Sequence, residues 1–308
     1  DLLPDIITGE DADDLIKRHD VDVLGVFTLA DVRPDLIRRA LRHGLHIIAE
    51  KPLAATVEEE EQLLQVIEAS NRLVAVNLFN RNASYHHYIQ TFIRSGEIGR
   101  LAILNISHQT PGLMPTEGHM PEGPPFHDCG MHYVDLARWY AQSEYARWDA
   151  QGIRMWGWHE PWWVNAHGSF ENGVVFTITQ GFTYGQLAAT PIIRSGLEAI
   201  GTLGVVRMEQ DFREVVIQCR GVERTETKRG PYTSKNLDVL CRTFAEALDA
   251  GRNTGFPTAR DSVIASQVSQ AMLDGARAHA APVVGTPQEM EQILRRKDDL
   301  RRMHREHT

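Results

Sequence analysis

Between residues 21 and 78, short apolar runs alternate with amphipathic helical segments, and this pattern limits the possible folds more than any other feature of the sequence. Residues 21–27, VDVLGVF, are nearly all apolar, as expected for a strand covered on both faces. Residues 46–50, HIIAE, and residues 73–78, LVAVNL, repeat the pattern. The β-α-β-α-β order predicts a parallel, doubly wound sheet of the Rossmann type with right-handed crossovers.

The two intervening segments carry the start and stop signals of helices. Pro34 suits a first helical turn, and Gly44 suits the position just after a helix end. Thr56 and Glu59 have the spacing of a capping box. Both helices are therefore predicted to begin shortly after a strand end, which is where ligands collect in doubly wound sheets.

After residue 80 the sequence changes to longer strands and fewer helices. We expect helices near 85–95 and from about 128, and a strand at 101–108. The Asn172-Gly173 pair lies between two alternating segments and predicts a hairpin. Helices near 235–250 and 258–280 would cover one face of the resulting large, open, mainly antiparallel sheet. The predicted fold class is therefore α/β followed by α+β.

A length of 308 residues favours two domains. The expected division is a partial nucleotide-binding Rossmann domain at 1–80 and an α+β domain for substrate binding and oligomerisation at 81–285. The charged segment 286–308 is expected to be a solvated tail.

Composition excludes several classes of function. No run of 18 apolar residues is present, which argues against a membrane span, and the net charge of -9 argues against nucleic acid as a partner. The three cysteines show no CxxC or zinc-finger spacing. They are expected to be reduced thiols of a cytoplasmic protein.

Residues 126–140, FHDCGMHYVDLARWY, form a predicted helix with an unusual polar stripe. Asp128, His132 and Asp135 follow the spacing i, i+4 and i+7, which places them on one helical face. A stripe of Asp and His on an otherwise apolar helix indicates either a helix lining a polar cleft or an ordinary solvated face. Asp128 is alternatively a simple helix cap.

A Glu-Lys-Pro triplet, residues 50–52, ends the second predicted strand. Lysines at strand ends most often lie in water, but this one lies at the ligand edge of a doubly wound sheet. Pro52 restricts the backbone after Lys51, and residues 28–31 end the neighbouring strand at the same edge. The position of Lys51 at this edge therefore favours a functional role over that of a solvated strand end.

Four ordered segments together resemble the glucose-fructose oxidoreductase and inositol dehydrogenase family, written Gfo/Idh/MocA. They are GLHIIAEKPLAATVEEEEQLL, VNLFNRNASYHHYIQTFIRSGEIGRL, DCGMHYVDLARWY and EAIGTLGVVRME. The resemblance extends to about residue 280. It implies an NAD- or NADP-dependent oxidoreductase that transfers a hydride to or from a secondary alcohol or ketone of a sugar, inositol or related polyol.

The resemblance also implies the site residues. Lys51, Asp128 and His132 match the catalytic and substrate-binding positions of the family. The expected cofactor-binding residues are Thr28, Leu29, Glu50, Lys51 and Arg81. Chemically, oxidation of an alcohol needs a base for the hydroxyl proton, which suits a histidine, while a lysine ammonium stabilises the developing alkoxide and an aspartate orients the base or the sugar.

One feature of the family is absent. No GxGxxG turn, which would bind the cofactor pyrophosphate, occurs in the sequence, and the strand pattern begins in mid-unit. A chain lacking about one β-α-β unit at its start is expected, so NAD and NADP cannot be distinguished. Alternatives are a non-catalytic sugar or nucleotide sensor of the same fold and an NAD-dependent enzyme that cleaves glycosidic bonds.

Two further groups of residues are interpreted as structural. His119, His127, His132 and Asp128 are close in sequence, but proximity alone does not make a metal site, and no metal is expected. Trp156, Trp158, Trp162 and Trp163 are expected to pack in the core or at an interface, with stacking on a sugar as the alternative. The open sheet face near them predicts a homodimer or homotetramer.

Overall fold

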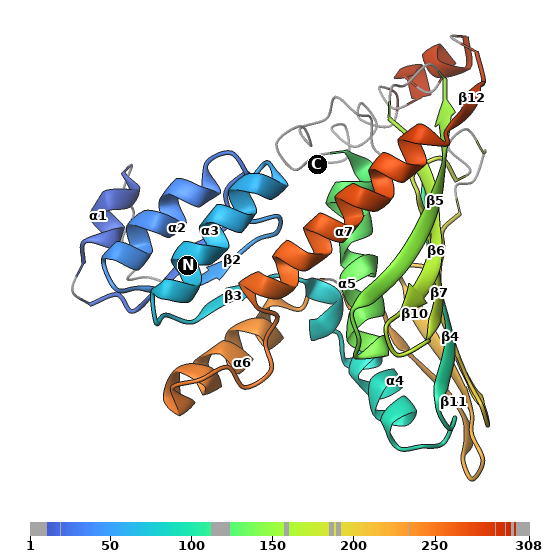
Figure 1. Ribbon diagram of the computed structural model, residues 1–308, viewed down its shortest axis with the longest axis horizontal. Coiled ribbons are helices and arrows are strands. Elements are labelled where there is room, and N and C mark those ends of the chain that lie inside the picture. Colours follow the sequence, from blue (N-terminus) through green and yellow to red (C-terminus); the bar gives the residue numbers. More distant parts are fainter. Residues whose placement is uncertain are drawn as a thin grey trace. The chain divides into compact units, whose positions relative to one another are not determined.

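The computed structural model describes residues 11–18, 20–111, 124–156, 160–184, 188, 192–233, 235–286, 288–292, 294–296 and 299. The chain divides into two compact units (Figure 1). The first unit contains residues 1–78 and 236–264, and the second contains residues 79–235 and 265–308. Each unit is described by itself.

The first unit holds a parallel sheet with the strand order β1-β2-β3. Its N-terminal part contains α1 (Ala12–Ile16), β1 (Val23–Val26), α2 (Arg33–Arg42), β2 (His46–Ala49), α3 (Val57–Ala69) and β3 (Val74–Val76). Val26 pairs with Ala49, and Ala49 pairs with Val76, so the carboxyl ends of all three strands lie at one edge. The predicted β-α-β-α-β order is confirmed.

Local signals begin and end these helices as expected. Thr56 caps α3 by accepting a hydrogen bond from the Glu59 amide at 3.2 Å. Pro34 lies in the first turn of α2, and Gly44 follows the helix with φ +79°, a conformation that glycine adopts without strain. Ile37 and Leu63 from the two helices pack with Ile47 of the central strand in one core.

Helix α6 (Leu237–Ala250) belongs to the first unit, which differs from the expectation that it would cover the antiparallel sheet. Its apolar side, with Leu240 and Phe244, packs against Ile48 of β2 and Ala75 of β3. Ala75 also forms a β-bridge with Thr258, just before α7 (Ala259–Ala278). The chain therefore returns to the first sheet before α7 carries it into the second unit.

Among its described residues, the second unit is built on a nine-stranded sheet with the order β11-β10-β9-β8-β4-β7-β6-β5-β12. Only the pairs β4·β7 and β5·β12 are parallel, so the predicted mainly antiparallel sheet is confirmed. The strands are β4 (Leu101–Gln109), β5 (Tyr145–Met155), β6 (Trp163–Phe170), β7 (Val175–Gly181), β8 (Arg194–Gly201), β9 (Val205–Gln210), β10 (Glu214–Arg220), β11 (Thr225–Pro231) and β12 (Ala281–Val284). Asn172 and Gly173 make the predicted turn between β6 and β7, and Gly173 has φ +87°.

Helices cover one face of this sheet, as predicted (Figure 1). They are η1 (Phe79–Asn82), α4 (Ser84–Arg94), η3 (Phe126–Gly130), α5 (Met131–Ala141) and the C-terminal part of α7. Strand β4 shows why one face is covered: Leu104 and Ile106 are buried beneath the helices, whereas Asn105 and Ser107 alternate with them and are more accessible. The strands therefore present a polar face on the side without helices.

The tryptophans near residue 160 pack within the protein. Trp156 and Trp162 are buried together, with exposed fractions of 6% and 3%, in a small cluster that includes Phe182. Trp163 is half-buried on the open face, and Trp158 lies outside the described residues. The interpretation of core packing is confirmed for Trp156 and Trp162.

No helix in the described part of the chain is long and apolar enough to cross a membrane. This agrees with the absence of a long apolar run in the sequence.

Candidate active site

Polar side chains gather at the carboxyl edge of the parallel sheet in the first unit. Glu50 and Lys51 follow β2, and Asn77 follows β3. The Asn77 amide nitrogen Nδ2 donates to Glu50 Oε1 at 2.8 Å, and the Asn77 backbone N–H donates to the Ala49 carbonyl at 2.8 Å. Lys51 is buried, with an exposed fraction of 9%. The edge is thus a polar surface, tied together by hydrogen bonds, with one buried ammonium group.

Two buried polar atoms at this edge are available to a bound ligand. The Thr28 hydroxyl Oγ1, after β1, and the amide oxygen Oδ1 of Asn77 are buried polar atoms without a hydrogen-bond partner among the described residues. Buried polar atoms are normally hydrogen-bonded, so a ligand with amide and hydroxyl groups would complete them. Leu29 lies beside Thr28 with its side chain half-exposed, where it offers apolar contact to a ring.

The predicted helix of the second unit begins with a π-helical turn, η3, followed by α5. Gly130 makes this turn compact, because a Cβ atom at this position would lie 2.8 Å from the buried Phe126 ring. Asp128 lies in the middle of the turn. Such π-turns occur frequently at functional sites.

His132 lies in the first turn of α5 and is buried. Its ring packs edge-on against Phe79, with ring centroids 4.4 Å apart. The Asn80 side chain lies 3.5 Å from the backbone oxygen of His132, at the limit of a hydrogen bond. Residues of η1 therefore hold both the ring and the backbone of His132 in place.

Asp135 has a different role from the one its spacing predicts. It is almost completely buried and accepts two hydrogen bonds from the Arg81 guanidinium, one of them 2.7 Å from Arg81 Nε to Asp135 Oδ2. The regular i, i+4, i+7 spacing does not hold through Asp128, because a π-turn contains more residues than an α-helical turn. Asp135 and Arg81 instead join α5 to η1.

The structure places the expected site residues in two groups. Thr28, Leu29, Glu50 and Lys51 lie at the sheet edge of the first unit. Asp128, His132 and Arg81 lie in the second unit. His119 lies outside the described residues, and the described residues contain no group of three His, Cys, Asp or Glu arranged to hold a metal.

Two buried polar residues at the first sheet edge are absent from the sequence-based set. Asn77 is 1% exposed, and its position at the end of an apolar run was a usable signal. Arg33 is also 1% exposed. An arginine beside a helix-starting proline looks like a solvated residue, so the sequence carries no signal for its burial.

Two models of one protein family match this chain. The family described as "Oxidoreductase family, NAD-binding Rossmann fold" matches residues 4–78, and the GFO/IDH/MocA C-terminal domain matches residues 86–207. The chain belongs to the GFO/IDH/MocA family. The resemblance noted in the sequence is confirmed, and the two matches correspond to the N-terminal part of the first unit and to much of the second.

Members of the GFO/IDH/MocA family with related sequences include dehydrogenases and reductases of polyols and sugars. Inositol 2-dehydrogenase 2 of Saccharopolyspora erythraea is 30% identical over 42% of this chain and 38% of its own length. The 1,5-anhydro-D-fructose reductase of Ensifer adhaerens is 26% identical over 62% of this chain and 58% of its own length. The chain thus matches less than two thirds of either relative.

Solved structures of the family share the fold. A putative myo-inositol dehydrogenase from Sinorhizobium meliloti has a TM-score of 0.72 and 21% identity, covering 86% of this chain and 82% of that chain. A levoglucosan dehydrogenase in complex with NADH and levoglucosan has a TM-score of 0.70 and 19% identity, covering 88% and 82%. At these identities the similarity establishes the architecture of this GFO/IDH/MocA protein.

Proposed function

We propose that this protein is an NAD- or NADP-dependent oxidoreductase that interconverts a secondary alcohol and a ketone on a sugar, inositol or related polyol. The observation that carries the proposal is the buried Lys51 at the carboxyl edge of the parallel sheet. A buried ammonium group costs stability and is not needed to end a strand, so its placement at the ligand edge favours a chemical role. The relatives named above support the substrate class.

Thr28, Leu29, Glu50, Lys51 and Arg81 are the proposed cofactor-binding residues. When bound, the nicotinamide accepts or donates the hydride. Thr28 and Asn77 offer buried polar atoms to this end of the cofactor. Arg81 forms an ion pair with Asp135, so it would contact the cofactor with a guanidinium that this pair holds in place.

Lys51, Asp128 and His132 are the proposed catalytic and substrate-binding residues. In the direction of alcohol oxidation, His132 accepts the hydroxyl proton at a ring nitrogen. The Lys51 ammonium donates a hydrogen bond to a substrate oxygen and stabilises its negative charge. Asp128 orients the imidazole or binds a substrate hydroxyl. Packing of the His132 ring against Phe79 would hold the base in one orientation.

The test is a panel of inositols and sugars with NAD and with NADP, measured on the complete protein. Replacing the base, His132→Asn, should lower kcat by on the order of 10²- to 10⁴-fold and leave cofactor affinity nearly unchanged. Lys51→Met should lower kcat and weaken binding together, since Lys51 is proposed to contact both cofactor and substrate.

The exposed His43 at the end of α2 gives a matched control, His43→Asn, which should keep the activity of the unmodified protein. Unchanged turnover in His132→Asn would refute the assignment of the base. Cofactor and sugar binding without turnover in the unmodified protein would instead indicate a sensor.

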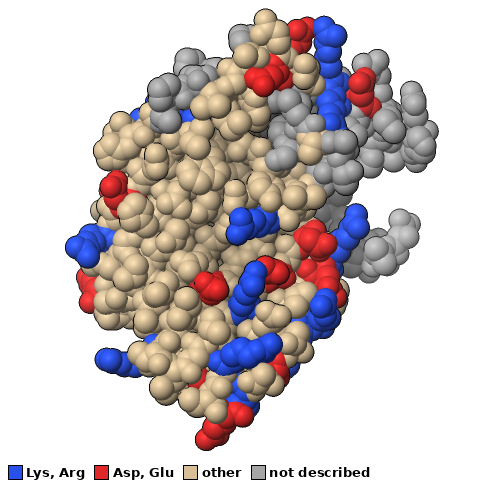
Figure 2. All heavy atoms as spheres, turned by 90° about the vertical axis from the view of Figure 1, so that its right-hand side faces the viewer, with Lys and Arg blue, Asp and Glu red and all other residues tan. Residues whose placement is uncertain are grey.

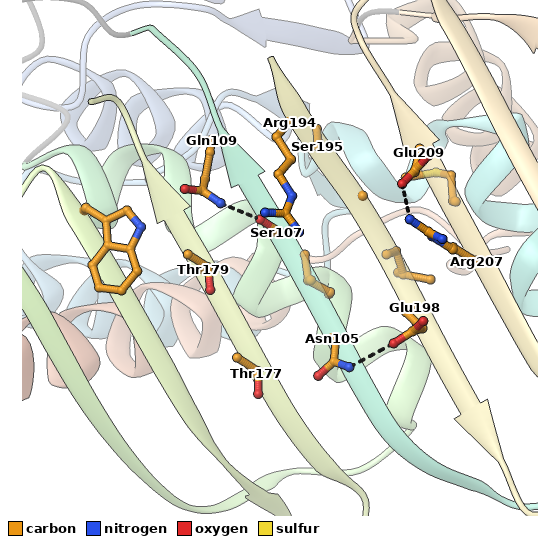
Figure 3. A pocket seen from close by; sticks show the side chains of 15 residues that line it. Asn105, Ser107, Gln109, Thr177, Thr179, Arg194, Ser195, Glu198, Arg207 and Glu209 are labelled. Carbon is orange, nitrogen blue, oxygen red and sulfur yellow. Dashed lines mark hydrogen bonds and ion pairs between the residues drawn. The ribbon is translucent and has the colours of Figure 1, made fainter. Parts of the chain in front are cut away.

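We also propose that the protein is a homo-oligomer in which the open sheet face of one copy packs on that of a second copy. Figure 2 views the side of the sheet without helices, where charged side chains of both signs are interspersed. This face carries a hollow of about 590 Å³. Figure 3 shows the side chains that line it. Its polar lining includes Asn105, Ser107, Gln109, Thr177, Thr179, Arg194, Glu198, Arg207 and Glu209.

Charge complementarity favours a second copy as the occupant. Arg207 pairs with Glu209 within one copy, and Arg194 lies on the same face as Glu198, so a two-fold arrangement can place Arg194 of one copy beside Glu198 of the other. Light scattering at micromolar concentration should show a dimer or tetramer. Glu198→Arg with Glu209→Arg should shift it to monomer, and an unchanged assembly in this variant would exclude the face.

A cytoplasmic location is proposed on the basis of the cysteines. Cys129, Cys219 and Cys241 are all free thiols in the structure. Labelling of all three with a thiol reagent in the denatured protein, prepared without reductant, would support it.

A further inference from the structure

One buried guanidinium joins the loops that follow the first two strands of the parallel sheet. Arg33 is the first residue of α2 and is 1% exposed. Its Nη1 donates a hydrogen bond to the backbone carbonyl of Pro52, and its Nη2 donates to the backbone carbonyl of Thr28. Thr28 follows β1, and Pro52 follows β2, so one side chain binds both strand ends.

Fold stability alone does not explain this arginine. A positive charge in the first turn of a helix lies against the positive end of the helix dipole, where an acidic residue such as Asp35 is preferred. Burial of the guanidinium adds a desolvation cost. The planar fork of arginine, however, can donate to two separate carbonyl oxygens, which one lysine ammonium on a flexible stem does less well.

A second buried charged residue holds the same loop from α3. Glu60 is fully buried, and its Oε1 accepts a hydrogen bond from the Leu53 backbone N–H at 2.7 Å. The Pro52 carbonyl is therefore bound from α2, and the adjacent Leu53 amide is bound from α3. Two ionisable side chains thus fix the backbone immediately after Lys51.

We propose that Arg33 is a positioning residue for Lys51: it fixes the loop that carries the lysine and ties that loop to Thr28. The proposal rests on the proposed function of Lys51. Arg33 does not itself contact the reacting atoms in this assignment. Arg33 affects turnover only by fixing the position of the Lys51 ammonium.

The first test measures the position of Lys51 without turnover. Each variant of the complete protein is treated briefly with acetic anhydride, and the acetylation rate of Lys51 is measured by peptide mass spectrometry. Arg33→Lys removes the two-pronged contact but keeps the charge, and it should raise the rate severalfold by freeing the loop. The exposed Arg42 on the same helix gives the matched control Arg42→Met, which should leave the Lys51 rate unchanged.

The rate at Lys17, a surface lysine of the first unit, separates loop release from general loosening. It should be equal in all variants. A Lys51 rate in Arg33→Lys equal to that of the unmodified protein, or a parallel rise at Lys17, would overturn the proposal.

The second test is a double-mutant cycle on kcat, with the best substrate of the sugar and inositol panel. Arg33→Met should lower kcat by on the order of 10²-fold, the cost of misplacing a catalytic group by about 1 Å. Combined with Lys51→Met, it should add nothing further, because both changes remove the same ammonium contact. An equal loss in both backgrounds would show that Arg33 acts elsewhere.

The two tests distinguish this proposal from the proposed function. Unchanged kcat in Lys51→Met would refute the role of Lys51, while the acetylation rates would still test the loop. If Arg33→Met does not fold, Arg33→Lys takes its place in the cycle, with a smaller loss of kcat that must again vanish in the Lys51→Met background.

Discussion

Two buried histidines in the second unit should make its stability fall steeply below pH 6.5. His86 on α4 bonds through Nδ1 to the Tyr140 hydroxyl at 2.9 Å, and burial lowers its pKa from 6.5 to about 3. His108 on β4 bonds through Nδ1 to the Ser195 hydroxyl at 3.0 Å, and burial lowers its pKa to about 4. Both are therefore neutral in the folded protein at pH 5.

The size of the effect follows from proton linkage. Between pH 6.5 and pH 5 the unfolded chain binds protons at both residues and the folded chain does not, so stability decreases as the pH falls. At pH 5, each histidine lowers the free energy of unfolding by about 2 kcal/mol relative to pH 8. The two together therefore lower it by about 4 kcal/mol. This is a large part of the ~5–15 kcal/mol that stabilises an ordinary domain.

Carboxylates act in a different pH range. Backbone amides of Glu223 and Arg224 lower the pKa of Glu97, and those of Glu214 and Arg213 lower the pKa of Asp211. These two groups contribute stability that is present above their ordinary pKa values of 4.5 and 3.8 and is lost only as the pH falls below them. The loss between pH 6.5 and pH 5 therefore reports the histidines.

The assay is urea denaturation at pH 8, 7, 6 and 5, followed by tryptophan fluorescence. All six tryptophans lie between residues 139 and 163, so the signal comes from the second unit. His108→Asn keeps a polar atom near Ser195 and should reduce the pH-dependent loss by about 2 kcal/mol. His167 is exposed, so the control His167→Asn should show the same pH-dependent loss of unfolding free energy as the unmodified protein. A free energy of unfolding that stays constant from pH 8 to pH 5 would refute the reasoning.

Three substitutions test the packing that positions the site, each by urea denaturation. Gly130→Ala places a methyl group 2.8 Å from the Phe126 ring and should cost about 1–3 kcal/mol; no loss would mean that the π-turn can adjust. Asp135→Ala leaves the Arg81 guanidinium without this partner and should cost about 3–5 kcal/mol, whereas a cost near zero would mark the pair as dispensable. Phe244→Ala should cost about 3–5 kcal/mol, read by circular dichroism, because α6 packs on the first sheet; a neutral result would contradict that packing.

Local features of the fold were predictable from the sequence. Thr56, Pro34 and Gly44 begin and end helices where expected, and the Asn172-Gly173 turn forms between β6 and β7. These signals depend on neighbouring residues and on the periods of helices and strands. The ordered motifs identified the family for the same reason, since each is a short continuous segment.

The candidate site was predictable in part. Lys51 was expected at a sheet edge because the strand pattern ends there, and Asp128 and His132 were expected at a helix start. Asp135 was expected on the same face as these two. The π-turn breaks the regular helical spacing, and Asp135 pairs with Arg81, which gives it a structural role. A π-turn has no sequence period that an apolar pattern reveals.

The sequence by itself determined which segments form helices and strands, because that choice depends on local propensity and on the spacing of apolar residues along the chain. Only the tertiary structure decided that α6 covers the parallel sheet, that Trp156 and Trp162 pack together, and that the Arg33 guanidinium lies between two strand ends. The sequence shows that an apolar helix face needs a surface to pack against and that a long cationic side chain needs hydrogen-bond acceptors. The partner itself is set by contacts between residues far apart in the sequence, whose geometry exists only once the sheet has formed.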